Sequence, residues 1–241
     1  MLASCADLFT GSAGGNALVY RAWSTGLPAD IEVCSIQIPR REGRSWEPLF
    51  TRLEPLLQAL LQTLRPHLNM PYAFFGHSLG ALIGFELARA LIREREPGPV
   101  HLFVSGHTAP QIPISCRALH RLDDAEFMQE IRRLNGTPTE ILDDAELMAL
   151  FLPALRADIA INETYVYTPG TPLECPISAY GGWEDNMTSH AGLADWREQT
   201  YGPFSLRMFP GDHFFLYSMQ KSLLAALIRD LTQSMNTQRI R

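Results

Sequence analysis

The sequence predicts an α/β fold with a mostly parallel, doubly wound sheet that is interrupted by a helical insertion. Short runs rich in apolar and β-branched residues alternate with longer segments of helical periodicity. Several of the short runs are apolar almost throughout, which is typical of strands covered on both faces. One stretch, residues 112–168, shows helical patterns and no convincing strand. Together these patterns predict a sheet with helices on both sides and a helical insertion.

Six strands and four core helices are expected from these patterns. The predicted strands are residues 6–10, 31–38, 72–75, 100–105, 176–180 and 204–209. The predicted helices are residues 48–65, 79–95, 191–200 and 219–233. A chain of 241 residues is long enough to form one large α/β domain around these elements.

Residues 112–168 form the predicted insertion, and residues 1–111 and 169–241 form the core. Asp123 and Asp143 are the expected helix N-caps, because a glutamate follows each at the capping-box spacing. A helical insertion between two core strands is most simply a lid over the carboxyl edge of the sheet, where ligands bind in open α/β folds. An extra layer of helices without a gating role is the alternative.

Charge and cysteine content narrow the classes of function. The net charge of −6 gives no general attraction for nucleic acid or an anionic membrane surface. No apolar stretch in the sequence is long enough to span a bilayer. The four cysteines form no C-x-x-C pair and lack zinc-ligand spacing. We therefore expect a cytoplasmic monomer with reduced cysteines, no metal site and no cofactor.

A candidate nucleophile, Ser78, lies in the segment Gly-His-Ser-Leu-Gly at residues 76–80. The pattern G-x-S-x-G occurs by chance, but here an apolar strand precedes it and a helix follows at once. That context predicts the strand–turn–helix elbow of an α/β-hydrolase. The backbone N–H of Leu79, directly after the nucleophile, is the expected first donor of an oxyanion hole. An ordinary turn serine is the alternative.

The general base and its acid partner should follow in the order serine, acid, histidine. His213 follows the last predicted strand and precedes the last helix, so it is the expected base. Asp185 follows the strand at 176–180 and is the expected acid, with Glu184 as the alternative. Asp212 adjoins the base and is poorly placed to orient its imidazole. The acid would fix the imidazole tautomer and stabilise the imidazolium.

The second oxyanion donor is expected in the glycine-rich loop after the first strand, residues 10–15. Ala13 is the preferred donor and Ser12 the alternative. Such a loop could also cradle a phosphate, but no lysine follows at P-loop spacing.

With these residues in place, the sequence resembles type II thioesterases, the stand-alone editing enzymes of polyketide and nonribosomal peptide synthesis. The likeness covers nearly the whole chain and is carried by residues 13–15, 37–44, 76–81, 134–138, 152–158 and 209–215. The family acid stands eleven residues before the tryptophan that matches Trp196, which again selects Asp185. Two departures are visible. Residues 10–15 lack the proline of the family's F-P-x-A-G-G, and Arg40 replaces the glycine of P-G-R-E.

The resemblance implies hydrolysis of acyl groups from the phosphopantetheine arm of acyl or peptidyl carrier-protein domains. The residues themselves support acyl transfer to water by Ser78 and His213, whereas the thioester bond is implied only by the resemblance. A carboxylesterase or lipase acting on oxygen esters is one alternative, and a cyclising thioesterase is another. A catalytically silent binding protein of the same fold is a third.

Overall fold

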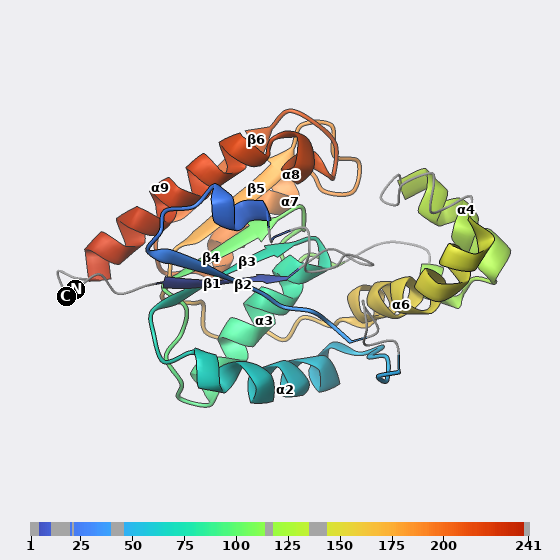
Figure 1. Cartoon of the computed structure of the whole chain (residues 1–241), viewed down its shortest axis with the longest axis horizontal. Coiled ribbons are helices and arrows are strands. Elements are labelled where there is room, and N and C mark those ends of the chain that lie inside the picture. Colours follow the sequence, from blue (N-terminus) through green and yellow to red (C-terminus); the bar gives the residue numbers. More distant parts are fainter. Residues whose placement is uncertain are drawn as a thin grey trace.

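The computed structural model describes residues 5–10, 20, 22–39, 46–113, 118–134 and 144–238. Its centre is a six-stranded, all-parallel sheet in the order β2-β1-β3-β4-β5-β6 (Figure 1). The strands are β1 Cys5–Thr10, β2 Ile31–Ser35, β3 Tyr72–His77, β4 His101–Ser105, β5 Ile177–Gly182 and β6 Phe204–Phe209. The order runs outward in both directions from β1, which confirms the predicted doubly wound α/β sheet.

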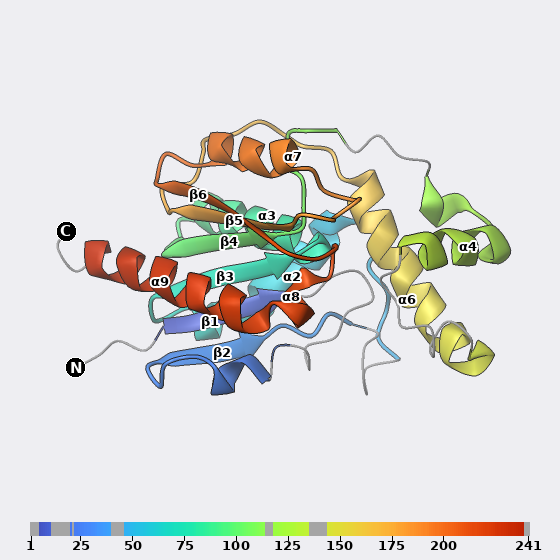
Figure 2. The ribbon, with the colours of Figure 1, turned by 90° about the horizontal axis from the view of Figure 1, so that it is seen from above.

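Helices cover both faces of this sheet (Figures 1 and 2). The elements of the core are η1 Ala22–Thr25, α2 Leu53–Leu64, η2 Arg65–His67, α3 Leu79–Arg93, α7 His190–Ala194, η4 Asp195–Gln199, α8 Phe215–Ser218 and α9 Gln220–Gln238. Helices α2 and α3 lie on one face and α9 on the other. In the described part of the chain, no helix combines the length and apolar character needed to cross a bilayer.

Side chains of the central strands alternate between the two faces. Tyr72 and Phe74 of β3 join the apolar cluster that contains α2 and α3, whereas Ala73 and Phe75 join the cluster that contains α9. This alternation is the period of two that a β-strand imposes. Both faces are covered, so every residue of β3, β4 and β5 is buried, as their near-continuous apolar sequences predicted.

Some element boundaries differ from the prediction for local reasons. Helix α2 begins at Leu53 instead of residue 48, because Arg52 is extended and the proline at position 55 falls in the first turn, where proline is tolerated. The segment at 191–200 forms two short helices, α7 and η4, instead of one. Strand β2 ends at Ser35, where its pairing with β1 ends.

The insertion contains η3 Leu119–Arg121, α4 Asp124–Leu134 and α6 Ala145–Thr164, and its described residues form no strand. Helices α4 and α6 share an apolar cluster of their own, centred on Phe127, Ile131, Met148 and Leu155. Asp123 accepts the N–H of Glu126 at 2.9 Å, which confirms that N-cap. Asp143 lies outside the described residues, and Asp144 accepts the N–H of Glu146 at 3.0 Å directly before α6. A lid role for this insertion stays a prediction.

A buried polar network joins α9 to the sheet. Asp230 on α9 accepts hydrogen bonds from Ser178 Oγ at 3.0 Å and Tyr180 OH at 3.1 Å, both on β5. Arg207 of β6 donates to both carboxylate oxygens, at 3.0 and 3.1 Å. Burial alone would raise the pKa of Asp230, but the hydrogen bonds from Arg207 and Ser178 outweigh it, and the pKa is lowered. The charged carboxylate therefore ties α9 to β5 and β6.

His101, at the start of β4, extends this network. Its Nδ1 lies 2.8 Å from Ser234 Oγ on α9, and its Nε2 lies 2.9 Å from Ser178 Oγ. Its ring stacks on Phe103 with a centroid separation of 4.0 Å. Burial lowers the pKa of His101 to about 4, although the charge of Asp230 opposes the shift. The imidazole is thus a neutral part of the core at neutral pH.

The native state should lose stability as the pH falls from about 6.5 to about 4. In that window the unfolded chain binds a proton at His101 that the native protein excludes, so acid favours unfolding. The shift corresponds to about 3 kcal/mol of unfolding free energy. Urea unfolding at about pH 7 and about pH 4.5 measures it. The variant His101→Asn should be less stable at neutral pH and less sensitive to acid. Equal acid sensitivity in both proteins would contradict the assignment.

Candidate active site

Ser78 occupies a sharp turn between β3 and α3. Its backbone has φ 54° and ψ −124°, and among the described non-glycine residues only Arg95 shares a positive φ. The N–H of Ser78 donates to the carbonyl oxygen of Ser105 at 2.7 Å, which anchors the turn to β4. Backbone strain of this kind costs about 1–3 kcal/mol and is concentrated at functional sites. The strand–turn–helix geometry expected of a nucleophile elbow is therefore present at Ser78.

Glycine at position 76 is required by the close approach of β3 to α3. A Cβ atom on Gly76 would lie 2.0 Å from the carbonyl oxygen of Gly80, well inside van der Waals contact. No side chain fits there without moving the helix away from the strand. The close packing of β3 against α3 therefore explains why the first residue of the G-x-S-x-G pattern is a glycine.

Helix α3 directs its amino-terminal end toward the position of Ser78. The first N–H groups of a helix have no intrahelical partner, and the side chain of Ser78 does not cap them. The N–H of Leu79, the expected oxyanion donor, belongs to this end, where the helix dipole favours negative charge. Ala13, the expected second donor, and its alternative Ser12 lie outside the described residues.

His213 and Asp185 meet at the carboxyl edge of the sheet. His213 follows β6, and Asp185 follows β5. Nδ1 of the His213 imidazole lies 2.9 Å from Oδ2 of the Asp185 carboxylate, and both side chains are buried. The other oxygen, Oδ1, accepts the main-chain N–H of Met187 at 2.7 Å and of Thr188 at 3.1 Å. A carboxylate held at both oxygens fixes the tautomer of the imidazole and leaves its Nε2 for proton transfer.

The other carboxylates near the base are used differently. Glu184 is exposed, and its main-chain N–H donates to the carbonyl oxygen of Gly211. Asp212 accepts the N–H of Phe214 at 2.8 Å and so braces its own loop. Of the three carboxylates considered from the sequence, the structure pairs Asp185 with His213.

Ser78 and His213 lie at the same edge of the sheet. The parallel register places His77 beside Ser105 and continues across β4 and β5 to β6, so these four strands present their carboxyl ends together. The ring of His77, directly before Ser78, has its centroid 4.9 Å from that of His213. Nothing in the sequence pattern around Ser78 indicates this contact between His77 and the base.

The other described histidines are engaged elsewhere or exposed. His107 has its Nδ1 2.6 Å from the carbonyl oxygen of Thr108 and its Nε2 3.0 Å from Oδ1 of Asn162 on α6. Burial is the main cause that lowers the pKa of His107. His120 is hydrogen-bonded to Glu163 within the insertion, and His67 and His190 are exposed.

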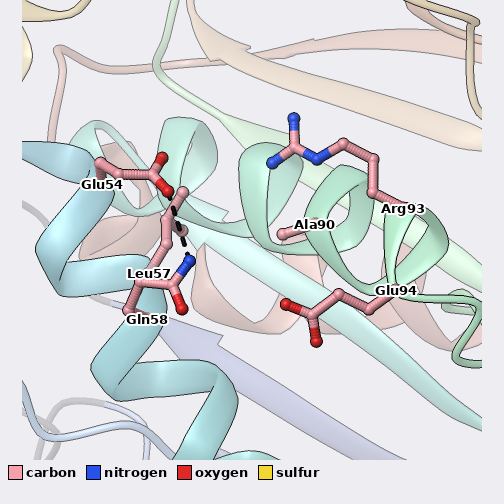
Figure 3. Close-up of a pocket in the computed structure, with 6 residues that line it drawn as sticks. All are labelled: Glu54, Leu57, Gln58, Ala90, Arg93 and Glu94. Carbon is pink, nitrogen blue, oxygen red and sulfur yellow. Dashed lines mark hydrogen bonds between the residues drawn. The ribbon is translucent and has the colours of Figure 1, made fainter.

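A surface pocket of about 300 Å³ lies between α2 and α3, as Figure 3 shows. It is lined by Glu54, Leu57, Gln58, Ala90, Arg93 and Glu94. Ser78 directly precedes α3 and Arg93 is its last residue, so about 20 Å of helix separates the two. This pocket is therefore distinct from the edge where Ser78 and His213 lie.

Comparison with known proteins places the chain in a family. The thioesterase domain family matches residues 8–234. The gramicidin S biosynthesis protein GrsT of Aneurinibacillus migulanus is 48% identical over 219 residues, which are 91% of this chain and 86% of that protein.

Solved structures agree with this placement. The RedJ thioesterase of the prodiginine pathway in Streptomyces coelicolor is 36% identical and superposes with a TM-score of 0.88, over 95% of this chain and 86% of that chain. The type II thioesterase BorB from the borrelidin biosynthetic cluster is 35% identical with a TM-score of 0.86, over 95% and 93% of the two chains. The chain therefore belongs to the thioesterase family and is a thioester hydrolase of the serine hydrolase class.

Proposed function

We propose that this thioesterase removes acyl groups from the phosphopantetheine arm of carrier-protein domains through a triad of Ser78, His213 and Asp185. The observation that supports the triad best is the buried hydrogen bond between His213 and Asp185, at the sheet edge where the strained elbow presents Ser78. The buried carboxylate orients the imidazole, and the elbow exposes the hydroxyl.

In the first half of the reaction, Ser78 Oγ attacks the thioester carbonyl carbon and its proton passes to Nε2 of His213. The imidazolium that forms is stabilised by Asp185, which stays ionised. Negative charge develops on the carbonyl oxygen beside the N–H of Leu79 at the start of α3. The carbon–sulfur bond then breaks, the sulfur takes the proton from His213, and the acyl group stays on Ser78 as an ester.

In the second half, a water molecule replaces the thiol. The water oxygen attacks the carbonyl carbon of the acyl-enzyme while His213 accepts a proton from the water. The tetrahedral intermediate collapses, the free carboxylic acid leaves, and Ser78 Oγ recovers its proton from the imidazolium. Both steps of the proposed reaction thus use the same serine, histidine and aspartate.

The carrier-bound substrate is supported by the relatives. GrsT and BorB are named for the biosynthesis of gramicidin S and borrelidin, and BorB is a type II thioesterase. The resemblance to type II thioesterases implies thioesters held by carrier proteins, and the likeness of GrsT and BorB to this chain extends over nearly all of it. We therefore assign acyl or peptidyl carrier domains as the partners.

Residues 112–168 act as a lid in this proposal. Figure 2 shows α4 and α6 beyond the carboxyl ends of the strands, the edge that holds Ser78. Several contacts between the insertion and the core are made by the end of α6 and by the segment that follows it. Asn162 bonds His107, Tyr165 OH lies 2.7 Å from Glu86 Oε1, and Arg89 donates to the carbonyl oxygen of Thr168 at 2.7 Å. An apolar cluster of its own allows the rest of the insertion to move as a unit.

The substrate assignment predicts a ranking of three substrates that carry the same acyl chain. The carrier-bound thioester should be cleaved with a kcat/KM at least about tenfold above that of the matching p-nitrophenyl ester, a difference of about 1.4 kcal/mol. A soluble pantetheine thioester should fall between them, because it keeps the reacting bond and the arm but lacks the carrier. Mass spectrometry of the loaded carrier and release of p-nitrophenol measure the rates.

The ranking separates the competing functions. A higher kcat/KM for the oxygen ester would favour the carboxylesterase alternative. Equal rates for the carrier and the soluble thioester would retain the thioesterase and contradict the carrier as partner. The Ser78→Ala protein supplies the background rate for all three substrates.

A further inference from the structure

The elbow histidine, His77, is packed against the proposed base. The two imidazole centroids are 4.9 Å apart and their planes are inclined by 48°. His77 is almost fully buried, and its Nδ1 lies 2.9 Å from Ser105 Oγ on β4. The rings of Phe214 and Phe215 also pack near it, each with a centroid 6.1 Å away. His77 is therefore held by several contacts while it touches His213.

Gly106, after β4, closes the space around both imidazoles. Its φ is 58°, and a Cβ atom on it would lie 2.7 Å from Cε1 of His77 and 3.1 Å from Cε1 of His213. The backbone thus approaches both rings more closely than any side chain would allow. His77, Gly106 and Phe214, whose ring centroid is 5.1 Å from that of His213, all lie against the base.

His77 is a neutral neighbour for the base. The pKa of His77 is held well below its usual range. Burial is the main cause, and the proximity of His213 and His107 lowers it further. Its Nε2 has no partner in good hydrogen-bond geometry among the described residues, although it approaches the main chain of His213. The ionisable groups around His213 are then Asp185, His77, His107 and Asp212. An imidazolium at His213 therefore forms beside a ring that carries no charge of its own.

We propose that His77 is a positioning residue for the base, and that its ring holds the imidazole of His213 in the orientation that proton transfer from Ser78 requires. This inference rests on the proposed role of His213. The hydrogen bond to Asp185 restrains Nδ1 of the imidazole, but small rotations about the Cα–Cβ and Cβ–Cγ bonds can still displace Nε2. The close contacts of His213 with His77 and with Gly106 restrict these rotations. Loss of such orientation reduces turnover without weakening substrate binding.

Three variants separate ring packing from fold stability. His77→Asn keeps a group able to pair with Ser105 but removes the ring that touches His213. His77→Phe keeps a ring and removes the polar atoms. His101→Asn is the matched control, because His101 is also buried, bonded to a serine and packed against an aromatic ring, but lies at the opposite end of β4. Five residues of strand place it about 16 Å from Gly106.

We expect His77→Asn to lower kcat on an acyl thioester about tenfold or more, with KM within about twofold of the wild-type value. His77→Phe should recover most of the lost kcat. His101→Asn should keep both constants within about twofold while its melting temperature falls at least as far as that of His77→Asn. The downfield proton resonance of the His213–Asp185 hydrogen bond should weaken only in His77→Asn.

Each outcome bears on a different claim. If wild-type protein hydrolyses acyl thioesters and Ser78→Ala does not, but His77→Asn keeps the wild-type kcat, the positioning role is wrong and the proposed function stands. An equal loss of kcat in His101→Asn also overturns it. If wild-type protein does not hydrolyse acyl thioesters, the proposed function itself fails. Should His77→Asn not fold, His77→Leu takes its place because it also removes the ring, and an unchanged kcat in that variant overturns the inference.

Discussion

Replacing Ser78 by alanine is expected to lower kcat on acyl thioesters by at least about a thousandfold. Without the hydroxyl no acyl-enzyme can form, and only the residual effect of substrate binding and the oxyanion hole remains. In mass spectra of the wild-type protein mixed with substrate, the added acyl mass should map to the peptide that contains Ser78. The alanine variant should show no such adduct.

The fold should survive this change. Ser78 is half-buried, and its turn is held by its main-chain N–H bond to Ser105 and by the crossing at Gly76, none of which involves the hydroxyl. The melting temperature should therefore stay within about 2 °C of the wild-type value. Substitution of the exposed Ser222 on α9 by alanine is a matched control and should leave kcat unchanged. Near-normal turnover by Ser78→Ala would reject the mechanism.

Replacing Asp185 by asparagine should have the next largest effect, a loss of about a thousandfold to ten-thousandfold in kcat. An amide nitrogen at the position of Oδ2 would donate to Nδ1 of His213 and force the proton onto Nε2. In that tautomer Nε2 cannot accept the proton of Ser78. The amide oxygen can still accept the main-chain bonds from Met187 and Thr188, so the loop should keep its conformation.

Glu184→Gln is the matched control for Asp185→Asn. It makes the same chemical change one residue earlier, on an exposed side chain, and should alter kcat/KM by less than about twofold. Steady-state kinetics of both variants on one carrier-bound substrate decide between the two carboxylates. A large loss in Glu184→Gln together with normal turnover in Asp185→Asn would reverse the assignment of the acid.

Much of the core was predictable because its patterns are local. The apolar runs placed all six strands, and strand β6 was predicted with its observed bounds. The ends of β3 and β5 were predicted too early. β3 pairs with β4 as far as His77, and β5 pairs with β6 as far as Gly182, although neither residue is typical of a strand. Helix starts were less accurate where a proline lies inside the first turn, as in α2.

The spatial contacts of the site were only partly predictable. The order of the motifs selected Ser78, Asp185 and His213, because each follows a strand whose carboxyl end lies at one edge of the sheet. The packing of His77 on His213 depends instead on how the ends of β3, β4 and β6 approach one another. No spacing in the sequence encodes that distance, so the role of His77 is visible only in the structure.

The separate apolar cluster between α4 and α6 has a consequence for divergence among related enzymes. None of its core residues belongs to either cluster that packs on the sheet. In the lid that we propose, substitutions in this cluster would change the surroundings of an incoming acyl chain and leave the packing beneath the reacting groups intact. Under this proposal, related enzymes can differ in acyl selectivity while they keep the same reacting groups.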